Sequence, residues 1–138
     1  MLIPAGAANV SHQFSFDLVT AANQFTNLNV SSVDIHDVFF HMHKLGERGR
    51  LWVGRSSGSD DCLLDIPHWD FDWQRGYRLE NPVTLQRGDT LGIKCWWDNT
   101  AANQPIIGGM RQSPTDVTWG DGTQDEMCLG VVYATPGN

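Results

Sequence analysis

Residues 33–43 read VDIHDVFFHMH, and their β-branched and aromatic side chains predict one long β-strand. Successive side chains of a strand point to opposite faces, so residues two apart share a face. His41 and His43 are therefore expected on the same side of this strand, close enough to bind one ion. The segment thus bears on both the fold and the function.

Alternation of apolar and polar residues recurs along the chain, whereas helical periodicity is nearly absent. Many short strands separated by polar or glycine-rich turns favour an all-β fold, a single antiparallel β-sandwich of jelly-roll or Greek-key type. Residues 1–138 are expected to form one domain. The longest irregular stretch, residues 98–115, has a length typical of functional or mobile loops. Further strands are expected over residues 10–18, 51–54, 62–66, 77–79, 83–85, 90–97 and 127–134.

The overall charge excludes two classes of partner. The net charge is −7 and the pI is near 4.9, which argues against nucleic acid and anionic membranes, because both need a basic surface. No apolar run approaches the roughly 20 residues needed to cross a bilayer. Residues 1–6 lack the pattern of a secretory signal, so a signal was removed or the chain is one domain of a longer protein.

A second segment, residues 125–128 (DEMC), places a thioether beside a cysteine. Together with two histidines, Met127 would make a soft ligand set suited to copper, especially Cu(I). A simpler reading is that the histidines are only hydrogen-bonded and that the methionine fills the core. Zinc is a rival metal, which would recruit a carboxylate and leave Met127 unbound.

The remaining histidines have weaker claims to the site. His36 has the opposite parity to the pair and is expected to face away from it, while His12 is expected to be half-buried with its hydrogen bonds made. His68 could approach the site through a loop. The three cysteines leave at least one thiol unpaired if a disulfide forms within the chain, and composition does not say which pair bonds.

Four motifs occur in a specific order: HMHKLG at residues 41–46, WDFDWQ at 69–74, GDTL at 88–91 leading to Cys95, and TQDEMC at 123–128. Together they resemble the C-terminal lobe of the copper type II ascorbate-dependent monooxygenases, the family that includes peptidylglycine α-hydroxylating monooxygenase and dopamine β-monooxygenase. The resemblance runs from about Ile3 to Tyr133, nearly the whole chain.

The resemblance implies one mononuclear copper, cycling between Cu(I) and Cu(II), held by His41, His43 and Met127. This lobe of the family activates dioxygen and hydroxylates a C–H bond. The resemblance also implies a disulfide between Cys95 and Cys128, which would stop Cys128 from serving as a thiolate ligand.

The sequence also leads to expectations for residues outside the ligand set and for the cellular location of the protein. Cys62 is then the unpaired thiol, and we expect it to be buried and inert. Asp125 and Glu126 are expected to be solvated loop carboxylates, although one of them, like His68, could contact a ligand histidine. Since disulfides form in oxidising compartments, the protein is expected to be extracytoplasmic, either periplasmic or secreted.

The chain departs from the family in two ways. Family enzymes have a second lobe whose three-histidine copper supplies an electron, and this chain has no room for it, so turnover with ascorbate and dioxygen would need a missing lobe, a partner, an external reductant or peroxide. The peptide-hydroxylating members bind a substrate carboxylate through an arginine, an asparagine and a tyrosine. The matching positions here are Phe39, Leu129 and Val131, which favours a small apolar substrate or none.

Two other functions remain open at this stage. The chain could be a non-catalytic copper-binding module for storage, delivery or electron transfer, as the absent lobe would suggest. It could also be a structural or interaction module whose metal site is vestigial. Copper content and product formation distinguish these functions from a monooxygenase.

Overall fold

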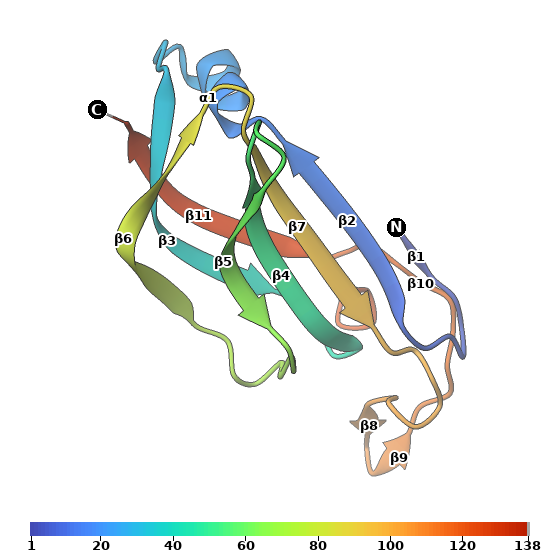
Figure 1. Cartoon of the computed structure of the whole chain (residues 1–138). Coiled ribbons are helices and arrows are strands. Elements are labelled where there is room, and N and C mark those ends of the chain that lie inside the picture. Colours follow the sequence, from blue (N-terminus) through green and yellow to red (C-terminus); the bar gives the residue numbers. More distant parts are fainter. Residues whose placement is uncertain (138) are drawn as a thin grey trace.

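The computed structural model describes residues 1–137, and two antiparallel sheets dominate it (Figure 1). The long elements are β2 (Val10–Phe16), α1 (Leu18–Thr26), β3 (Ser32–His41), β4 (Gly46–Gly54), β5 (Asp60–Ile66), β6 (Gly76–Gln86), β7 (Thr90–Trp97) and β11 (Leu129–Pro136). One sheet has the strand order β11–β3–β6 and the other the order β2–β7–β4–β5. Two short ladders join β1 (Leu2–Ile3) to β10 (Val117–Thr118) and β8 (Ile106–Ile107) to β9 (Met110–Arg111).

The two sheets face each other and form a sandwich, so the expected all-β class is confirmed (Figure 1). Glycines allow them to approach closely. A Cβ at Gly49 of β4 would collide with the ring of Phe40 of β3, and a Cβ at Gly130 of β11 would collide with Leu51. The core that lies between the sheets is built from buried aliphatic and aromatic side chains, among them Val33, Ile35, Val38, Phe40, Leu51, Val53, Leu85, Leu91 and Trp97.

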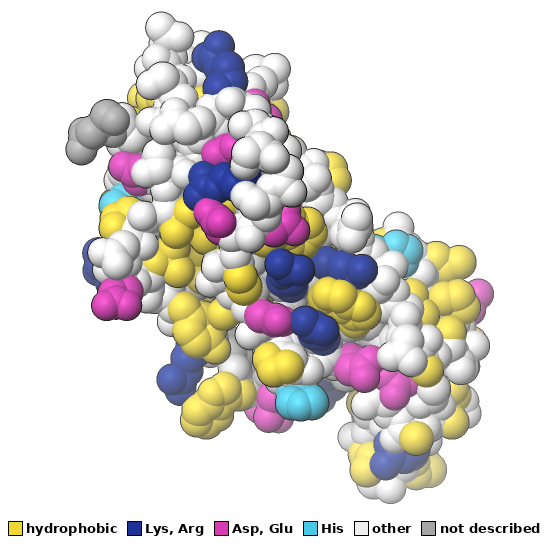
Figure 2. Space-filling view, in the orientation of Figure 1, with side chains coloured by type: hydrophobic (Ala, Val, Ile, Leu, Met, Phe, Trp, Pro, Cys, Tyr) yellow, Lys and Arg dark blue, Asp and Glu magenta, His cyan; other side chains and the backbone are white. Residues whose placement is uncertain are grey.

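The outer face of the four-stranded sheet carries cations stacked on indoles. The Arg48 guanidinium and the Lys94 ammonium lie 4.9 and 4.8 Å from the centre of the Trp96 ring, and the Arg50 guanidinium lies 5.6 Å from that of Trp52. Figure 2 shows Lys and Arg side chains (dark blue) lying among hydrophobic ones (yellow) on the face over β4, β5 and β7. The cations cover apolar ring surface that a sheet of this kind would otherwise expose to water.

Helix α1 was not predicted, since residues 10–18 were expected to form one strand that in fact ends at Phe16. Asp17 begins the helix, because its side chain accepts a hydrogen bond from the Thr20 amide at 2.9 Å. Val19 is fully buried, and Leu18 and Ala22 pack partly buried against the core. Within residues 1–137, no helix is both long and apolar enough to cross a membrane.

Other expected boundaries also moved. Strand β7 matches its prediction, whereas the strands expected at 77–79 and 83–85 are one strand, β6, whose pairing with β3 shifts between Ile35 and Asp37. Strand β3 ends at His41 and β11 begins at Leu129. His43 and Met127 therefore lie in irregular chain just outside the sheets.

The long connection after β7 is fixed by buried amides. The Asn99 side chain is fully buried, and its Nδ2 donates to the carbonyls of Ile3, Pro4 and Thr115 at 2.8–3.1 Å. The Arg111 guanidinium donates to the carbonyls of Ala102 and Gln104 at 2.6 and 2.7 Å. These bonds satisfy backbone groups that no sheet supplies with partners, so the irregular chain has a defined path.

The disulfide expected from the resemblance is present. Cys95 of β7 is bonded to Cys128, 33 residues later in the sequence. The expectation that Cys62 would be buried was wrong: it is an exposed free thiol. It lies on β5, an edge strand, where a register shift against Trp52 turns the neighbouring Leu63 inward instead.

We predict that replacing both bonded cysteines (Cys95→Ala with Cys128→Ala) lowers the free energy of unfolding by about 3–4 kcal/mol, because the unfolded chain loses its closed loop. Urea denaturation followed by tryptophan fluorescence measures this change. The matched control is Cys62→Ser, an exposed position where the effect should stay within about 0.5 kcal/mol. An unchanged urea midpoint in the double variant would show that the bond contributes nothing.

Candidate metal centre

The centre begins with a pair of imidazole rings at the end of β3. The ring centroids of His41 and His43 are 5.0 Å apart and their planes are inclined at 79°. The ring of Phe71 lies against both, with centroid distances of 6.4 and 6.2 Å. The expected proximity of the two histidines is therefore observed, and an aromatic side chain from the loop between β5 and β6 adds an apolar wall.

Hydrogen bonds fix the same tautomer in both rings. The Nδ1 of His43 lies 2.8 Å from the Asp125 carbonyl oxygen, which can only accept, so this nitrogen carries the proton. The Nδ1 of His41 lies 2.6 Å from the Gln74 Oε1, and the Gln74 Nε2 donates to the Phe71 carbonyl at 2.6 Å, which fixes the orientation of that amide. When neutral, each ring therefore has its lone pair on Nε2, the nitrogen with no hydrogen bond within residues 1–137.

Met127 is held between two contacts to the histidines. Two residues before it, the Asp125 carbonyl accepts the hydrogen bond from His43. Two residues after it, Leu129 pairs with His41 in the β3–β11 ladder. Since two residues of chain span at most about 7 Å, the Met127 Cα lies within that distance of both of these residues. Its side chain is half-buried.

Glu126 holds this segment to the sandwich and was wrongly expected to be solvated. It is 1% exposed, and its Oε2 accepts hydrogen bonds from the His43 amide at 2.9 Å and the Trp97 indole at 3.0 Å. Its Oε1 accepts from the Leu45 amide at 2.6 Å. Burial raises the pKa of Glu126 above its ordinary value, and the donors from Leu45, His43 and Trp97 act in the opposite direction.

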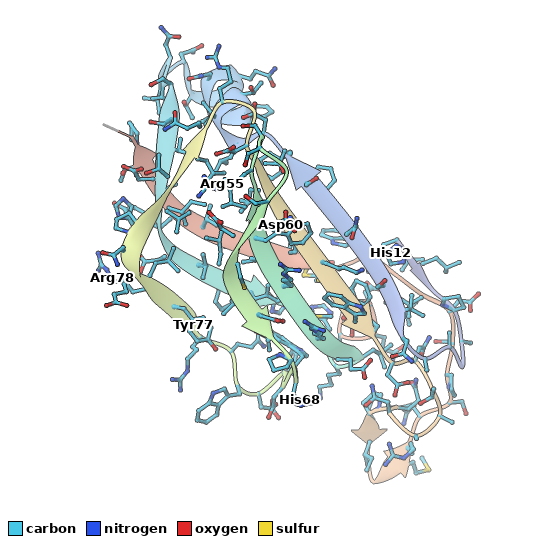
Figure 3. The ribbon with its side chains drawn as sticks, viewed as in Figure 1. His12, Arg55, Asp60, His68, Tyr77 and Arg78 are labelled. Atoms are coloured by element: carbon cyan, nitrogen blue, oxygen red, sulfur yellow. A yellow bond between two sulfur atoms is a disulfide. The ribbon has the colours of Figure 1, made fainter. Side chains whose placement is uncertain are left out.

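The other candidates have different surroundings. The Asp125 carboxylate accepts from the Gly122 amide, so this residue touches His43 through its backbone alone. His68 is exposed in the loop beyond β5, while His12 lies on β2 (Figure 3). His12 Nε2 is bonded to the Leu2 carbonyl, and His36 Nε2 is bonded to the Thr135 hydroxyl, both at 2.9 Å. Across residues 1–137, no three His, Cys, Asp or Glu side chains gather as a metal site.

Sequence reasoning missed the residues that support the pair. Gln74 bonds His41, and the Trp69 indole donates to the His43 carbonyl at 3.0 Å. Both belong to the WDFDWQ motif, which carried the resemblance without assigning either side chain to a histidine. The signal was thus visible as a motif, although spacing alone could not assign a partner to either side chain.

Comparison with known proteins identifies the family. Residues 1–135 match the family model described as copper type II ascorbate-dependent monooxygenase, C-terminal domain. The chain belongs to this family. It is also 26% identical over 106 residues to DBH-like monooxygenase protein 1 of Gallus gallus, an alignment that covers 77% of this chain. The chain spans 16% of the length of that relative.

We predict that Glu126→Ala lowers the free energy of unfolding by about 3 kcal/mol or more, because three buried N–H groups lose their acceptor. Glu126→Gln should cost less, since the amide oxygen still accepts. Urea denaturation measures both changes, and Asp121→Ala, an exposed carboxylate of the same segment, is the control that should leave stability unchanged. A loss of similar size in Asp121→Ala would mean that general charge, rather than these hydrogen bonds, stabilises the segment.

Proposed function

We propose that this chain binds one copper ion through the Nε2 atoms of His41 and His43 and the sulfur of Met127, and that it acts as the oxygen-activating half of a C–H-hydroxylating monooxygenase. The observation that carries the proposal is the shared tautomer: both Nδ1 atoms donate to acceptors, which leaves two Nε2 lone pairs on adjacent rings. Family membership supports copper as the ion. Bound copper would supply the one-electron and dioxygen chemistry of the family.

The protein's own part is to orient the ligands. Gln74 and the Asp125 carbonyl hold the imidazole protons on Nδ1, which raises the basicity of the opposite nitrogens. Trp69 and Glu126 hold the backbone of His43 from its carbonyl and its amide. Fixing the rings in advance removes part of the ordering cost of metal binding.

The balance of electrons requires a second component. Hydroxylation of a C–H bond by dioxygen consumes two further electrons and two protons and releases water, whereas peroxide brings both oxidising equivalents with it. One copper centre passes electrons singly, so we propose that ascorbate acts through an electron-donor lobe or partner, or that peroxide replaces the dioxygen and reductant.

The face beside His41 supports a small apolar substrate. Leu129 lies opposite His41 and Val131 opposite Phe39 on neighbouring strands, so these four side chains share one face of the sheet. Val131 is 54% exposed, although it is apolar. The disulfide supports an extracytoplasmic location for the protein, since such bonds persist in oxidising compartments.

We predict that the chain binds one Cu(I) and that X-ray absorption of this form shows a sulfur neighbour that is lost in Met127→Ile. His41→Ala should weaken binding by at least about tenfold. Met110→Ile, which changes an exposed methionine on β9, is the matched control and should keep the sulfur signal. Persistence of that signal in Met127→Ile, or coordination by nitrogen and oxygen alone, would exclude this ligand set.

Turnover separates an enzyme from a copper-binding module. With ¹⁸O-labelled peroxide and ethylbenzene, the copper-loaded chain should form 1-phenylethanol that carries the label, and Met127→Ile or a copper chelator should abolish it. Product yield is measured by mass spectrometry, with free copper at the same concentration as the control. Stoichiometric copper binding without labelled product would instead identify a storage, delivery or electron-transfer module. Copper binding far below one equivalent would identify a vestigial site.

A further inference from the structure

We infer that a cavity beside the segment that holds His43 binds a small neutral molecule that combines an apolar body with a hydrogen-bond donor such as a hydroxyl. The cavity is separate from the imidazole faces, because neither His41 nor His43 lines it. Its existence does not depend on copper, so this inference can hold or fail independently of the proposed function.

The cavity measures about 310 Å³ and lies between the long connection after β7 and the segment before β11. The β8–β9 hairpin, which hangs below the sandwich in Figure 1, contributes Ile107, while Leu45, Pro105 and Val117 add further apolar wall. Asp125 and Glu126 line the cavity as well. This volume falls at the lower end of the range for small-molecule pockets, and the mixture of apolar walls with a few polar groups is typical of them.

One buried side chain presents an unused acceptor to this space. Gln104 is 6% exposed, and its Nε2 donates to the Asn99 Oδ1 at 2.8 Å and the Thr100 carbonyl at 3.2 Å. Its Oε1 accepts no hydrogen bond from residues 1–137. Within the same residues, no fully buried side-chain nitrogen or oxygen lacks a partner, so this oxygen must reach open space. Gln104 lines the cavity, so we infer that its oxygen faces that space.

The amide is held rigidly in this orientation. Asn99, its hydrogen-bond partner, is fixed by the carbonyls of Ile3, Pro4 and Thr115. The Gln104 carbonyl is bound by Arg111 at 2.7 Å. A side chain fixed at both its amide and its backbone cannot turn its oxygen back into the protein without breaking these bonds, so the acceptor is preorganised for a ligand.

The chemistry of the lining selects a neutral donor. Of the two carboxylates, that of Glu126 already accepts three hydrogen bonds and that of Asp125 binds the Gly122 amide. Lys44 is an exposed lining residue, and its ammonium lies 5.6 Å from the Phe71 ring centre. Binding through Lys44 would favour an anion, whereas binding through the Gln104 oxygen favours an alcohol, and the buried, fixed acceptor argues for the alcohol.

A ligand in this cavity would also be detected at the histidine site. Asp125 and Glu126 line the cavity and bond to the ring and the backbone amide of His43. The amide proton of His43, which donates to the Glu126 carboxylate, is therefore a sensitive reporter of occupancy.

The test is a titration of the metal-free, ¹⁵N-labelled chain with benzyl alcohol, followed by two-dimensional NMR. Saturable shifts are expected at the amides of residues 104–117 and 123–126 and at that of His43. Benzyl methyl ether, which lacks the donor, and benzoate, which carries a negative charge, should each bind about tenfold more weakly, because neither can donate to the Gln104 oxygen. Absence of saturable shifts, or equal or tighter binding of the ether or of benzoate, overturns the inference.

A matched pair of variants locates the site. Ser113→Trp places a large side chain on the lining and should abolish the benzyl alcohol shifts. Ser57→Trp makes the same change in the exposed β4–β5 turn and should leave them intact. Retention of the shifts in Ser113→Trp, or their loss in Ser57→Trp, contradicts binding in this cavity. The comparison of alcohol with ether uses the unmodified chain and remains decisive if a variant fails to fold.

Discussion

A buried carboxylate with three N–H donors is the interaction on which the rest of this structure depends. The donors to Glu126 come from the turn that joins β3 of one sheet to β4 of the other, and from the end of β7. Removing a carboxylate from water is costly, and only a full set of donors offsets that cost. Displacing the segment around Glu126 would break all three hydrogen bonds together, so these bonds hold it in place although it is not part of a sheet.

The disulfide also holds the segment around Glu126 against β7. Cys95 and Trp97 are two residues apart on β7, and they tie to Cys128 and Glu126 respectively. One covalent and one hydrogen-bonded link thus join the same strand to the same short segment, and Met127 lies between the two linked residues. Backbone hydrogen bonds add a third constraint, because Glu126 donates to Thr118 and accepts from Gly120. Met127, the residue proposed as the sulfur ligand, therefore lies in a segment held by a disulfide, a side-chain hydrogen bond and backbone hydrogen bonds.

Local patterns predicted the scaffold, and long-range contacts decided the details of the site. Strand β7 follows from alternation, and the proximity of His41 and His43 follows from their being two residues apart, although His43 lies just beyond the end of β3. The burial of Glu126 could not follow from such a pattern, since its donor His43 is 83 residues away and its own neighbours are acidic and glycine-rich. Helix α1 was missed for another reason: apolar residues on one parity run from Val10 to Leu18, so the predicted strand was extended past the Asp17 cap at which the helix begins.

The histidines of this chain fall into two hydrogen-bonding patterns. His12 and His36 use Nε2, the nitrogen farther from the backbone, to bond the Leu2 carbonyl and the Thr135 hydroxyl. His41 and His43 do the reverse, since their bonded nitrogen is Nδ1. The nitrogens without a described hydrogen bond are therefore Nδ1, next to the backbone, in His12 and His36, and Nε2, on adjacent rings, in His41 and His43. Two unbonded Nε2 atoms on adjacent rings are the arrangement that the proposed shared cation requires.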